Sequence, residues 1–234
     1  MPNLHLIPIT ISDENVAQQI PSGVIEVMFN TKHIIAENAK TARRYIKKSG
    51  YTGPMQDFDV FELNKHEPTE GVYEYLKSCL AKKVDVAVMS EAGCPGIADP
   101  GSFAVEKAHQ LGYFVQPYVG PNSIILTLMA SGFNGQSFTF HGYLPKDKGE
   151  LKRKLIQMET ESSKQRNAHL FIETPYRNAA MIDQLTGCLK NSTKVCIGIN
   201  LQSNQQKVIT KTIGDLKKSQ INIDKIPAVF AIQS

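Results

Sequence analysis

The sequence has 234 residues, of which 41% are hydrophobic and 21% charged, with a formal net charge of +4. This composition is typical of a globular chain with one large or two smaller domains, and it excludes a wholly disordered chain. No apolar run approaches the roughly 20 residues of a membrane helix, and the start of the chain has no basic region typical of a signal peptide. The four cysteines lack C-x-x-C spacing, which predicts reduced thiols in a cytoplasmic protein without a membrane segment.

Apolar runs alternate with helical patterns in the first half of the chain. Strands are expected at 4–9, 33–37, 59–63, 84–90 and 114–118, and helices at 21–29, 41–48, 68–82 and 101–110. The run 84–89 is almost entirely apolar, as in a strand that is covered on both faces. This alternation predicts an α/β domain with a mostly parallel sheet.

The second half begins with an expected helix at 123–131. It continues with strands at 137–143 and 169–173, helices at 150–159 and 175–185, and strands at 195–199, 207–213 and 228–232. The last strands follow one another closely, and the uncharged polar run Asn200–Gln206 between two of them predicts a hairpin or loop. Successive strands with short connections favour antiparallel pairing, so a mixed sheet is expected. We therefore predict two α/β domains, 1–118 and 119–234.

Charge is distributed unevenly along the chain. Residues 1–117 carry a net charge of −3 and residues 118–234 a net charge of +7. A basic second half could meet a polyanion such as RNA, or could form a solubilising lysine surface. The same two interpretations apply to Lys152, Arg153 and Lys154, which are candidates for RNA contact or for a solvated helix face. The six histidines are scattered without metal-ligand spacing, so no metal site is expected.

The segment richest in special residues is S-E-A-G-C-P-G-I-A-D-P-G, from Ser90 to Gly101. It starts where an apolar strand ends and finishes where a helix begins, which is where open α/β sheets bind ligands. Asp99 is expected to cap the helix with Pro100 at its first position, and the glycines allow close backbone approach. A second turn, Gly120–Ser123, also joins a strand to a helix. Motifs of dinucleotide folds and P-loop proteins are missing from the sequence.

These residues resemble the S-D-A-G-T-P-x-I-x-D-P-G signature of the tetrapyrrole-methylase superfamily. The branch that methylates a ribose 2′-hydroxyl of small-subunit ribosomal RNA is the most similar. Further pieces follow in the family's order: Leu4–Pro8, the pair Ala36-Glu37, Pro117–Ser123, His141–Lys146 and Phe171–Arg177. The family's charged R-E-L-T-K segment aligns with the neutral run Asn200–Asn204.

The resemblance implies a homodimer of two-domain subunits that hold S-adenosylmethionine, the methyl donor, in the cleft between the domains. Transferred position by position, the donor site would include Pro8, Thr10, Ile11, Gly93, Cys94, Ile97, Asp99, Ser123, Ile124, Thr174, Pro227 and Ala228. A sulfonium favours carbonyl dipoles and apolar walls, and the donor's carboxylate suits exposed backbone N–H groups. Methyl transfer from a sulfonium needs no metal ion.

The acceptor side is less clearly defined by the sequence. Glu37 ends a strand and could orient or deprotonate a hydroxyl acceptor, or could be a solvent-facing carboxylate. Glu173, four residues before Arg177, predicts an internal ion pair rather than a catalytic group. His141 and Tyr143 are expected on one strand face, with Tyr143 as a packed aromatic residue or beside the ligand.

The sequence therefore predicts an S-adenosylmethionine-dependent methyltransferase acting in rRNA processing, with an RNA ribose 2′-hydroxyl as acceptor. One alternative keeps the fold and donor but changes the acceptor to a tetrapyrrole-like small molecule or another molecule. A second alternative is a non-catalytic relative that binds the donor. The neutral run at 200–206, which replaces a charged segment of the family, is the observation that favours it.

Overall fold

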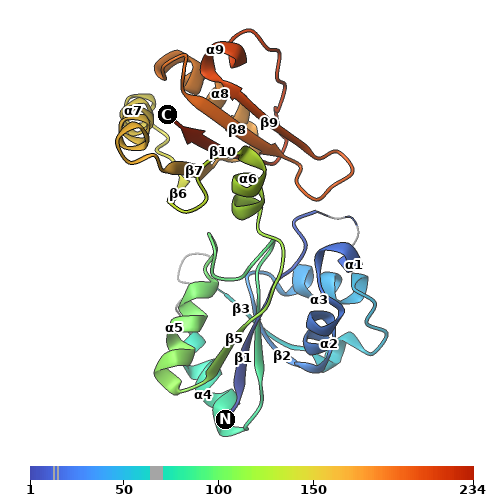
Figure 1. Ribbon diagram of the computed structural model, residues 1–234. Helices are drawn as coiled ribbons and strands as arrows, with labels where there is room; N and C mark the ends of the chain where they lie inside the picture. The colour runs from blue at the N-terminus through green and yellow to red at the C-terminus, as the bar shows by residue number, and fades with distance from the viewer. Residues whose placement is uncertain (13, 15, 64–70) are drawn as a thin grey trace. The chain divides into compact units, whose positions relative to one another are not determined.

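The computed structural model describes residues 1–12, 14, 16–63 and 71–234. The chain forms two compact units, Met1–Asn122 and Ser123–Ser234, each with its own five-stranded sheet (Figure 1). The boundary predicted between residues 118 and 119 stays a prediction. The predicted fold class is confirmed, since one sheet is parallel and the other mixed.

The first unit is a parallel sheet covered on both faces. Its strand order is β3-β2-β4-β1-β5, and every described pair is parallel. The strands are β1 (Asn3–Ile7), β2 (His33–Ala36), β3 (Asp59–Glu62), β4 (Val86–Met89) and β5 (Phe114–Pro117). The main helices are α2 (Ser22–Asn30), α3 (Ala39–Lys48), α4 (Val72–Ala81) and α5 (Gly101–Leu111). All four residues of β4 are buried, as its apolar sequence predicts.

Two apolar clusters hold this sheet between its helices. One cluster packs α2 and α3 against one face, with Met28 and Ile46 at its centre. The other packs α4 and α5 against the opposite face through Leu76 and Ala104. The short helices α1 (Val16–Gln19) and η1 (Met55–Asp57) were not expected, because a single turn has no apolar periodicity to read. Part of the helix expected at 68–82 lies outside the described residues.

The second unit has a mixed sheet in the order β6-β7-β10-β8-β9. β6 and β7 are parallel, and the other described pairs are antiparallel. The strands are β6 (Phe138–Tyr143), β7 (Ala168–Ile172), β8 (Lys194–Ile199), β9 (Lys207–Thr212) and β10 (Ala228–Gln233). The helices are α6 (Ser123–Ser131), α7 (Lys148–Gln165), η2 (Pro175–Arg177), α8 (Asn178–Cys188) and α9 (Ile213–Leu216). The residues 200–206 connect β8 and β9 as a hairpin loop, as predicted.

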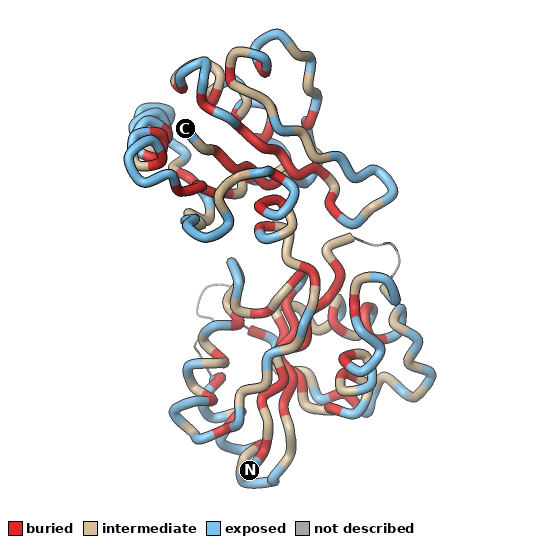
Figure 2. Tube along the Cα trace, in the orientation of Figure 1, coloured by how far each residue is buried: buried red, intermediate tan, exposed pale blue. Residues whose placement is uncertain are grey.

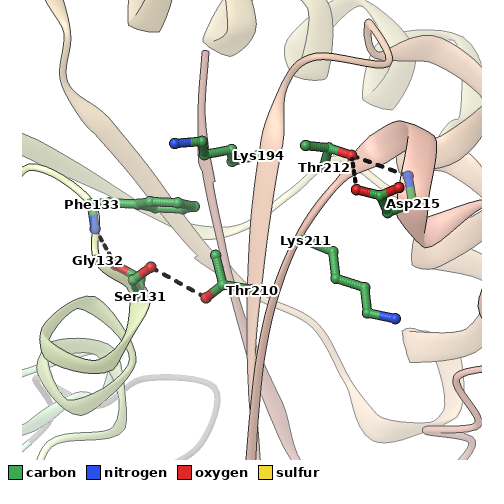
Figure 3. A pocket seen from close by; sticks show the side chains of 8 residues that line it. All are labelled: Ser131, Gly132, Phe133, Lys194, Thr210, Lys211, Thr212 and Asp215. Carbon is green, nitrogen blue, oxygen red and sulfur yellow. Dashed lines mark hydrogen bonds between the residues drawn. The ribbon is translucent and has the colours of Figure 1, made fainter.

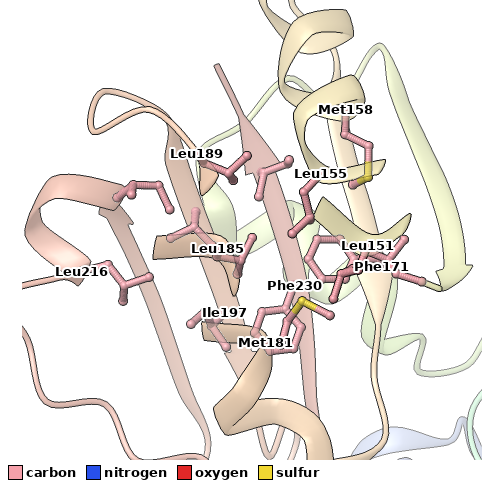
Figure 4. Close-up of a cluster of buried hydrophobic side chains, with 14 of the residues drawn as sticks. Leu151, Leu155, Met158, Phe171, Met181, Leu185, Leu189, Ile197, Leu216 and Phe230 are labelled. Carbon is pink, nitrogen blue, oxygen red and sulfur yellow. The ribbon is translucent and has the colours of Figure 1, made fainter. Parts of the chain in front are cut away.

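Helices α7 and α8 pack on one face of this sheet and α6 on the other. Figure 4 shows the cluster on the α7 and α8 face, which contains Leu155 and Leu185 and in which the rings of Phe171 and Phe230 stack 5.3 Å apart. Buried residues follow the central strands in both units (Figure 2). Apolar burial of this kind contributes roughly 25 cal/mol per Å² and is the main force that stabilises each unit.

Helix α7 is longer than the predicted 150–159. Asp147 caps its start by accepting a hydrogen bond from the Glu150 amide at 2.9 Å. The buried face of the helix continues past the predicted end to Ser162, which is fully buried. The Ser162 hydroxyl donates a hydrogen bond to the Asn167 carbonyl at 2.7 Å, which allows this polar side chain to be buried. The polar run at 160–165 conceals this burial in the sequence, which is why the prediction stopped short.

Candidate functional site

Three loops of the first unit meet at the carboxyl ends of β4, β1 and β5, which are neighbours in the sheet. The segment after β1 pairs with the loop after β4, where the amide of Ile9 donates to the Gly93 carbonyl at 2.9 Å and the Gly93 amide to Ile9 at 3.2 Å. The Cys94 thiol lies 3.4 Å from the carbonyl oxygen of Pro121, in the loop after β5. The predicted residues Pro8, Gly93 and Cys94 therefore lie in one connected set of loops.

Glycine is required at two points where these loops touch. Gly93 has φ of +75°, and a Cβ there would lie 3.3 Å from the Pro121 carbonyl oxygen. Gly120 packs directly on the ring of Pro8, where a Cβ would lie 2.2 Å from the proline Cβ. Ordinary carbon contacts are about 3.5–4.0 Å, so this approach of the two loops depends on the missing side chain.

Asp99 organises the loop but does not cap α5 in the predicted way. Its Oδ1 accepts from the amides of Gly96 at 2.9 Å and Gly101 at 2.7 Å, and the N-cap residue is Pro100. The helix begins at Gly101, as expected, but Pro100 precedes it instead of taking its first position, because Asp99 also bonds back to Gly96 and closes its own loop. Burial raises the pKa of the Asp99 carboxyl, while the two amides lower it. Its Oδ2 is buried and has no hydrogen-bond partner among the described residues.

The same loop exposes backbone and apolar surface rather than positive charge. Ile97 is 48% exposed, so its apolar side chain is accessible on the surface of this loop. Ala98 has φ of +62°, a conformation that residues other than glycine seldom adopt. No lysine or arginine occurs from Ser90 to Gly101. Such a surface suits a ligand with apolar and hydrogen-bonding parts.

Thr10 and Ile11 continue the segment that follows β1. The amide of Thr10 donates to the hydroxyl of Tyr45 at 3.1 Å, and the amide of Ile11 to the side chain of Gln19 at 3.2 Å. Burial raises the pKa of the Tyr45 phenol, which stays a neutral anchor for this segment. Tyr45 was not singled out from the sequence because it resembles any core residue of an amphipathic helix.

Glu37 follows β2 at the same edge of the sheet. Ala36, the last residue of β2, pairs with Met89, the last residue of β4, so Glu37 and Ser90 both emerge at the carboxyl ends of adjacent strands. Glu37 is half-buried. This placement is compatible with a role beside a bound ligand and also with a structural role.

In the second unit, three predicted residues gather at one end of the sheet. Ala228 pairs with Ile199, and the amide of Asn200 donates to the Pro227 carbonyl at 3.0 Å. The buried Asn178 donates to the Ile226 carbonyl at 2.6 Å, which ties this strand start to the segment that begins at Thr174. Asn178 was missed by the sequence reading because a buried asparagine gives no local signal.

Helix α6, which carries Ser123 and Ile124, lies close over the same sheet. A Cβ on Gly198 would lie 2.4 Å from the Thr127 hydroxyl oxygen, so glycine allows this close approach. Ile124 is buried with Leu128 against Ala231 and Cys196. Ser123 and Ile124 are thus positioned by helix packing on the sheet.

The predicted ion pair between Glu173 and Arg177 is present, with 3.2 Å between Oε2 and Nη2. Glu173 Oε1 also accepts from the amide of Thr174 at 2.7 Å. The carboxylate therefore holds the turn after β7 in shape.

The interpretation of Tyr143 as a packed aromatic residue is wrong, and its position beside a ligand stays a prediction. The register of β6 against β7 shifts between Phe140 and Tyr143, and Gly142 has φ of +65°. A bulge at this point breaks the alternation of side chains, and Tyr143 is 61% exposed. His141 instead hydrogen-bonds His169 at 2.7 Å, and burial lowers the pKa of His141 to about 4.

Two basic surfaces lie in the second unit. Lys152 and Arg153 are exposed on α7 and Lys154 is half-buried. Figure 3 shows a separate pocket of about 530 Å³, lined by Phe133, Lys194, Thr210 and Lys211 among others. Asp215 in this pocket accepts a hydrogen bond from the Thr212 hydroxyl at 2.7 Å. Neither surface contains a residue predicted for the donor.

No group of three or more His, Cys, Asp or Glu side chains is arranged to hold a metal ion within residues 1–12, 14, 16–63 and 71–234. Among the helices described by the structure, none has the length and hydropathy needed to cross a bilayer.

Similar solved structures define the fold. The methyltransferase CobJ aligns with the whole of this chain and 95% of its own, with a TM-score of 0.66 and 13% identity. Uroporphyrin-III C-methyltransferase from Thermus thermophilus, solved with S-adenosylhomocysteine, covers 99% of this chain and 97% of its own, with a TM-score of 0.59 and 9% identity. The chain thus has the fold of the tetrapyrrole methyltransferases.

Curated relatives that share one name are similar to this chain. Ribosomal RNA small subunit methyltransferase I of Bacillus subtilis is 25% identical over 98% of this chain and 73% of its own length. The enzyme of the same name from Borrelia garinii is 27% identical over 92% of each chain. No family model matches the sequence. The predicted resemblance and the predicted enzyme class, a methyltransferase, are confirmed.

Proposed function

We propose that this chain transfers a methyl group from S-adenosylmethionine to a ribose 2′-hydroxyl of small-subunit ribosomal RNA. The observation that carries the proposal is the similarity to ribosomal RNA small subunit methyltransferases over 98% of the chain. The loops of the first unit add a physical reason. They meet through contacts that require glycine, at the carboxyl edge of a parallel sheet, where such sheets bind ligands.

The residues present fit this donor. The exposed apolar side chain of Ile97 and the cation-free loop suit a sulfonium, which a lysine or arginine would repel. The buried Oδ2 of Asp99 can accept a hydrogen bond from a ligand. We propose that Pro8, Thr10, Ile11, Gly93 and Cys94 complete the donor residues of the first unit. Those of the second unit are Ser123, Ile124, Thr174, Pro227 and Ala228.

The donor supplies an electrophilic methyl group, so the protein's tasks are to position the acceptor oxygen and remove its proton. Orientation of two reactants lowers a barrier by up to roughly 7–11 kcal/mol in well-aligned systems. Glu37, at the carboxyl end of β2, is the proposed proton acceptor. The exposed Lys152 and Arg153, with Lys154, are proposed to contact phosphates of the RNA. We also propose that the enzyme forms a homodimer and works in the cytoplasm, where its RNA substrate occurs.

Transfer of labelled methyl groups tests this function. The purified chain is incubated with labelled donor and a small-subunit rRNA transcript that carries no modifications. The RNA is then digested to nucleosides, and label is expected in a 2′-O-methylated nucleoside. Fractionated cell extract serves as a parallel acceptor. Label confined to small molecules would refute the RNA acceptor and favour the tetrapyrrole alternative. Donor binding without any transfer would favour the non-catalytic alternative.

A further inference from the structure

A pocket of about 440 Å³ lies in the second unit beside the neutral loop between β8 and β9. It is bounded by the end of β8, the start of β9 and the segment 220–226 that leads toward β10. None of the residues predicted for the donor lines it, and neither do Lys152, Arg153 and Lys154. The sequence singled out this loop, and the proposed function so far gives it no task.

The lining combines an apolar floor with a rim of neutral amides. The floor is made of the isoleucines Ile199, Ile209, Ile221 and Ile226, and the rim carries the carboxamides Asn200, Asn204, Gln205, Gln220 and Asn222. Lys207 is the one charged residue among those that line the pocket, and none of them is a carboxylate. Carboxamides donate and accept hydrogen bonds at the same time. This lining therefore fits a neutral group that both donates and accepts hydrogen bonds.

The pocket walls are held in shape by the backbone. β8 and β9 pair over six residues each, and the loop turns through Asn200 and Gln202, which have φ of +45° and +64°. The Ser203 amide donates to the Asn200 carbonyl at 3.1 Å. On the opposite wall, Asn222 accepts from the Asp224 amide at 3.1 Å. A pocket with fixed walls loses less conformational entropy when it binds a ligand.

We propose that this pocket takes an unpaired nucleobase of the RNA substrate. The inference rests on the proposed function, because it assigns to the same enzyme a contact with its acceptor. Single-stranded bases are recognised through their hydrogen-bonding edges while their faces pack on side chains, and asparagine and glutamine pair with adenine through two hydrogen bonds. A phosphate would need more positive charge than Lys207 provides, and a cation would need carboxylates. Lys207 is placed at the rim to meet the phosphate next to the base.

The test measures RNA binding and its salt dependence together. The probe is a labelled, unmodified small-subunit rRNA transcript, bound to the full chain in a filter assay at several salt concentrations. Gln205 and Gln220 are both exposed, so the double variant Gln205→Ala/Gln220→Ala should fold normally. Loss of one bidentate contact should weaken binding about tenfold. The slope of log affinity against log salt should stay unchanged, because no phosphate contact is removed. Gln157→Ala, an exposed amide on α7 outside the pocket, is the matched control.

Other results separate the failures of the two proposals. A double variant that binds RNA as tightly as wild type would overturn the pocket while leaving the proposed function in place. A salt slope flattened by more than the single Lys207 contact would show that the carboxamides support phosphate contacts and not a base contact, and would also overturn it. Calorimetry with S-adenosylhomocysteine should give the same affinity for variant and wild type, and a loss there would assign the pocket to the donor. Wild-type protein that binds no RNA would refute the RNA acceptor and with it this inference.

Discussion

Replacing Gly120 with alanine should loosen the loop junction in the first unit. The added Cβ would lie 2.2 Å from Cβ and 2.4 Å from Cγ of Pro8, at least about 1.1 Å inside ordinary contact. A proline ring has no rotamer by which to escape, so the backbone of one loop must shift. Overpacking of this kind lowers the free energy of unfolding by about 1–3 kcal/mol. Alanine also reduces the conformational entropy of the unfolded chain, which offsets about 0.4–1 kcal/mol of that loss. The net loss of about 1–2 kcal/mol should lower the Tm by about 2–8 °C for a chain of this size.

Thermal and urea denaturation followed by circular dichroism measure this loss, and calorimetry with S-adenosylhomocysteine measures its effect on the donor site. Gly23→Ala is the matched control, because Gly23 lies in α2 of the same unit with nothing within 4 Å of its Cβ position. That change should be neutral or slightly stabilising, since alanine favours helix. If Gly120→Ala unfolds at or above the wild-type urea midpoint, the packing argument is wrong. Weakened donor binding is expected together with the lower stability.

Three further predictions concern other parts of the molecule. Ile97→Arg should weaken the binding of S-adenosylmethionine by more than about tenfold, because the added guanidinium repels the sulfonium, and should weaken the binding of S-adenosylhomocysteine less. The Tm should be unchanged because the side chain is exposed. Equal affinity of variant and wild type for S-adenosylmethionine would contradict this. Replacing Lys152, Arg153 and Lys154 with alanine should flatten the salt slope of RNA binding in the filter assay. Each lost phosphate contact should reduce the slope by about 0.7–0.9, for up to three contacts. An unchanged slope would exclude these side chains as phosphate contacts. Burial lowers the pKa of His141 to about 4. Between about pH 6.5 and pH 4 the unfolded chain therefore binds more protons than the folded chain, so the stability should fall as the pH falls through this range. His141→Gln should reduce the drop in Tm between about pH 7 and pH 5, and an equal drop in both proteins would refute the assignment.

The sequence predicts much of the donor side because its information is local. Glycines and prolines at the ends of apolar strands mark the loop from Ser90 to Gly101, and parallel strand order then brings that loop to Ile9 and Pro121. Asp99 shows the limit of such local rules. A carboxylate before a proline predicts a helix cap, yet Asp99 bonds back to Gly96 within its own loop. That Asp99 reaches the Gly96 amide as well as the Gly101 amide depends on the three-dimensional path of the loop.

Other features depend on contacts between distant segments and could not be predicted. Tyr143 was misplaced because a bulge at Gly142 changes the side-chain alternation, and glycine alone does not distinguish a bulge from a regular strand. The contact of His141 with His169 joins strands whose register the sequence does not specify. Buried Asn178 is similar, since its partner Ile226 lies 48 residues away in the chain.

The outer strands of both sheets have a consequence for solubility. β3 and β9 each stand at one end of their sheet, and the outer edge of such a strand is a template for pairing with another chain. β3 is four residues long and has exposed Asp59 and Glu62 at its ends, while β9 carries Lys207 and Lys211. Like charges would face each other if the same edge of two copies met, so these side chains act against aggregation during synthesis. Neutralising the lysines of β9 would leave a Val-Ile-Thr core of high β-propensity without such protection.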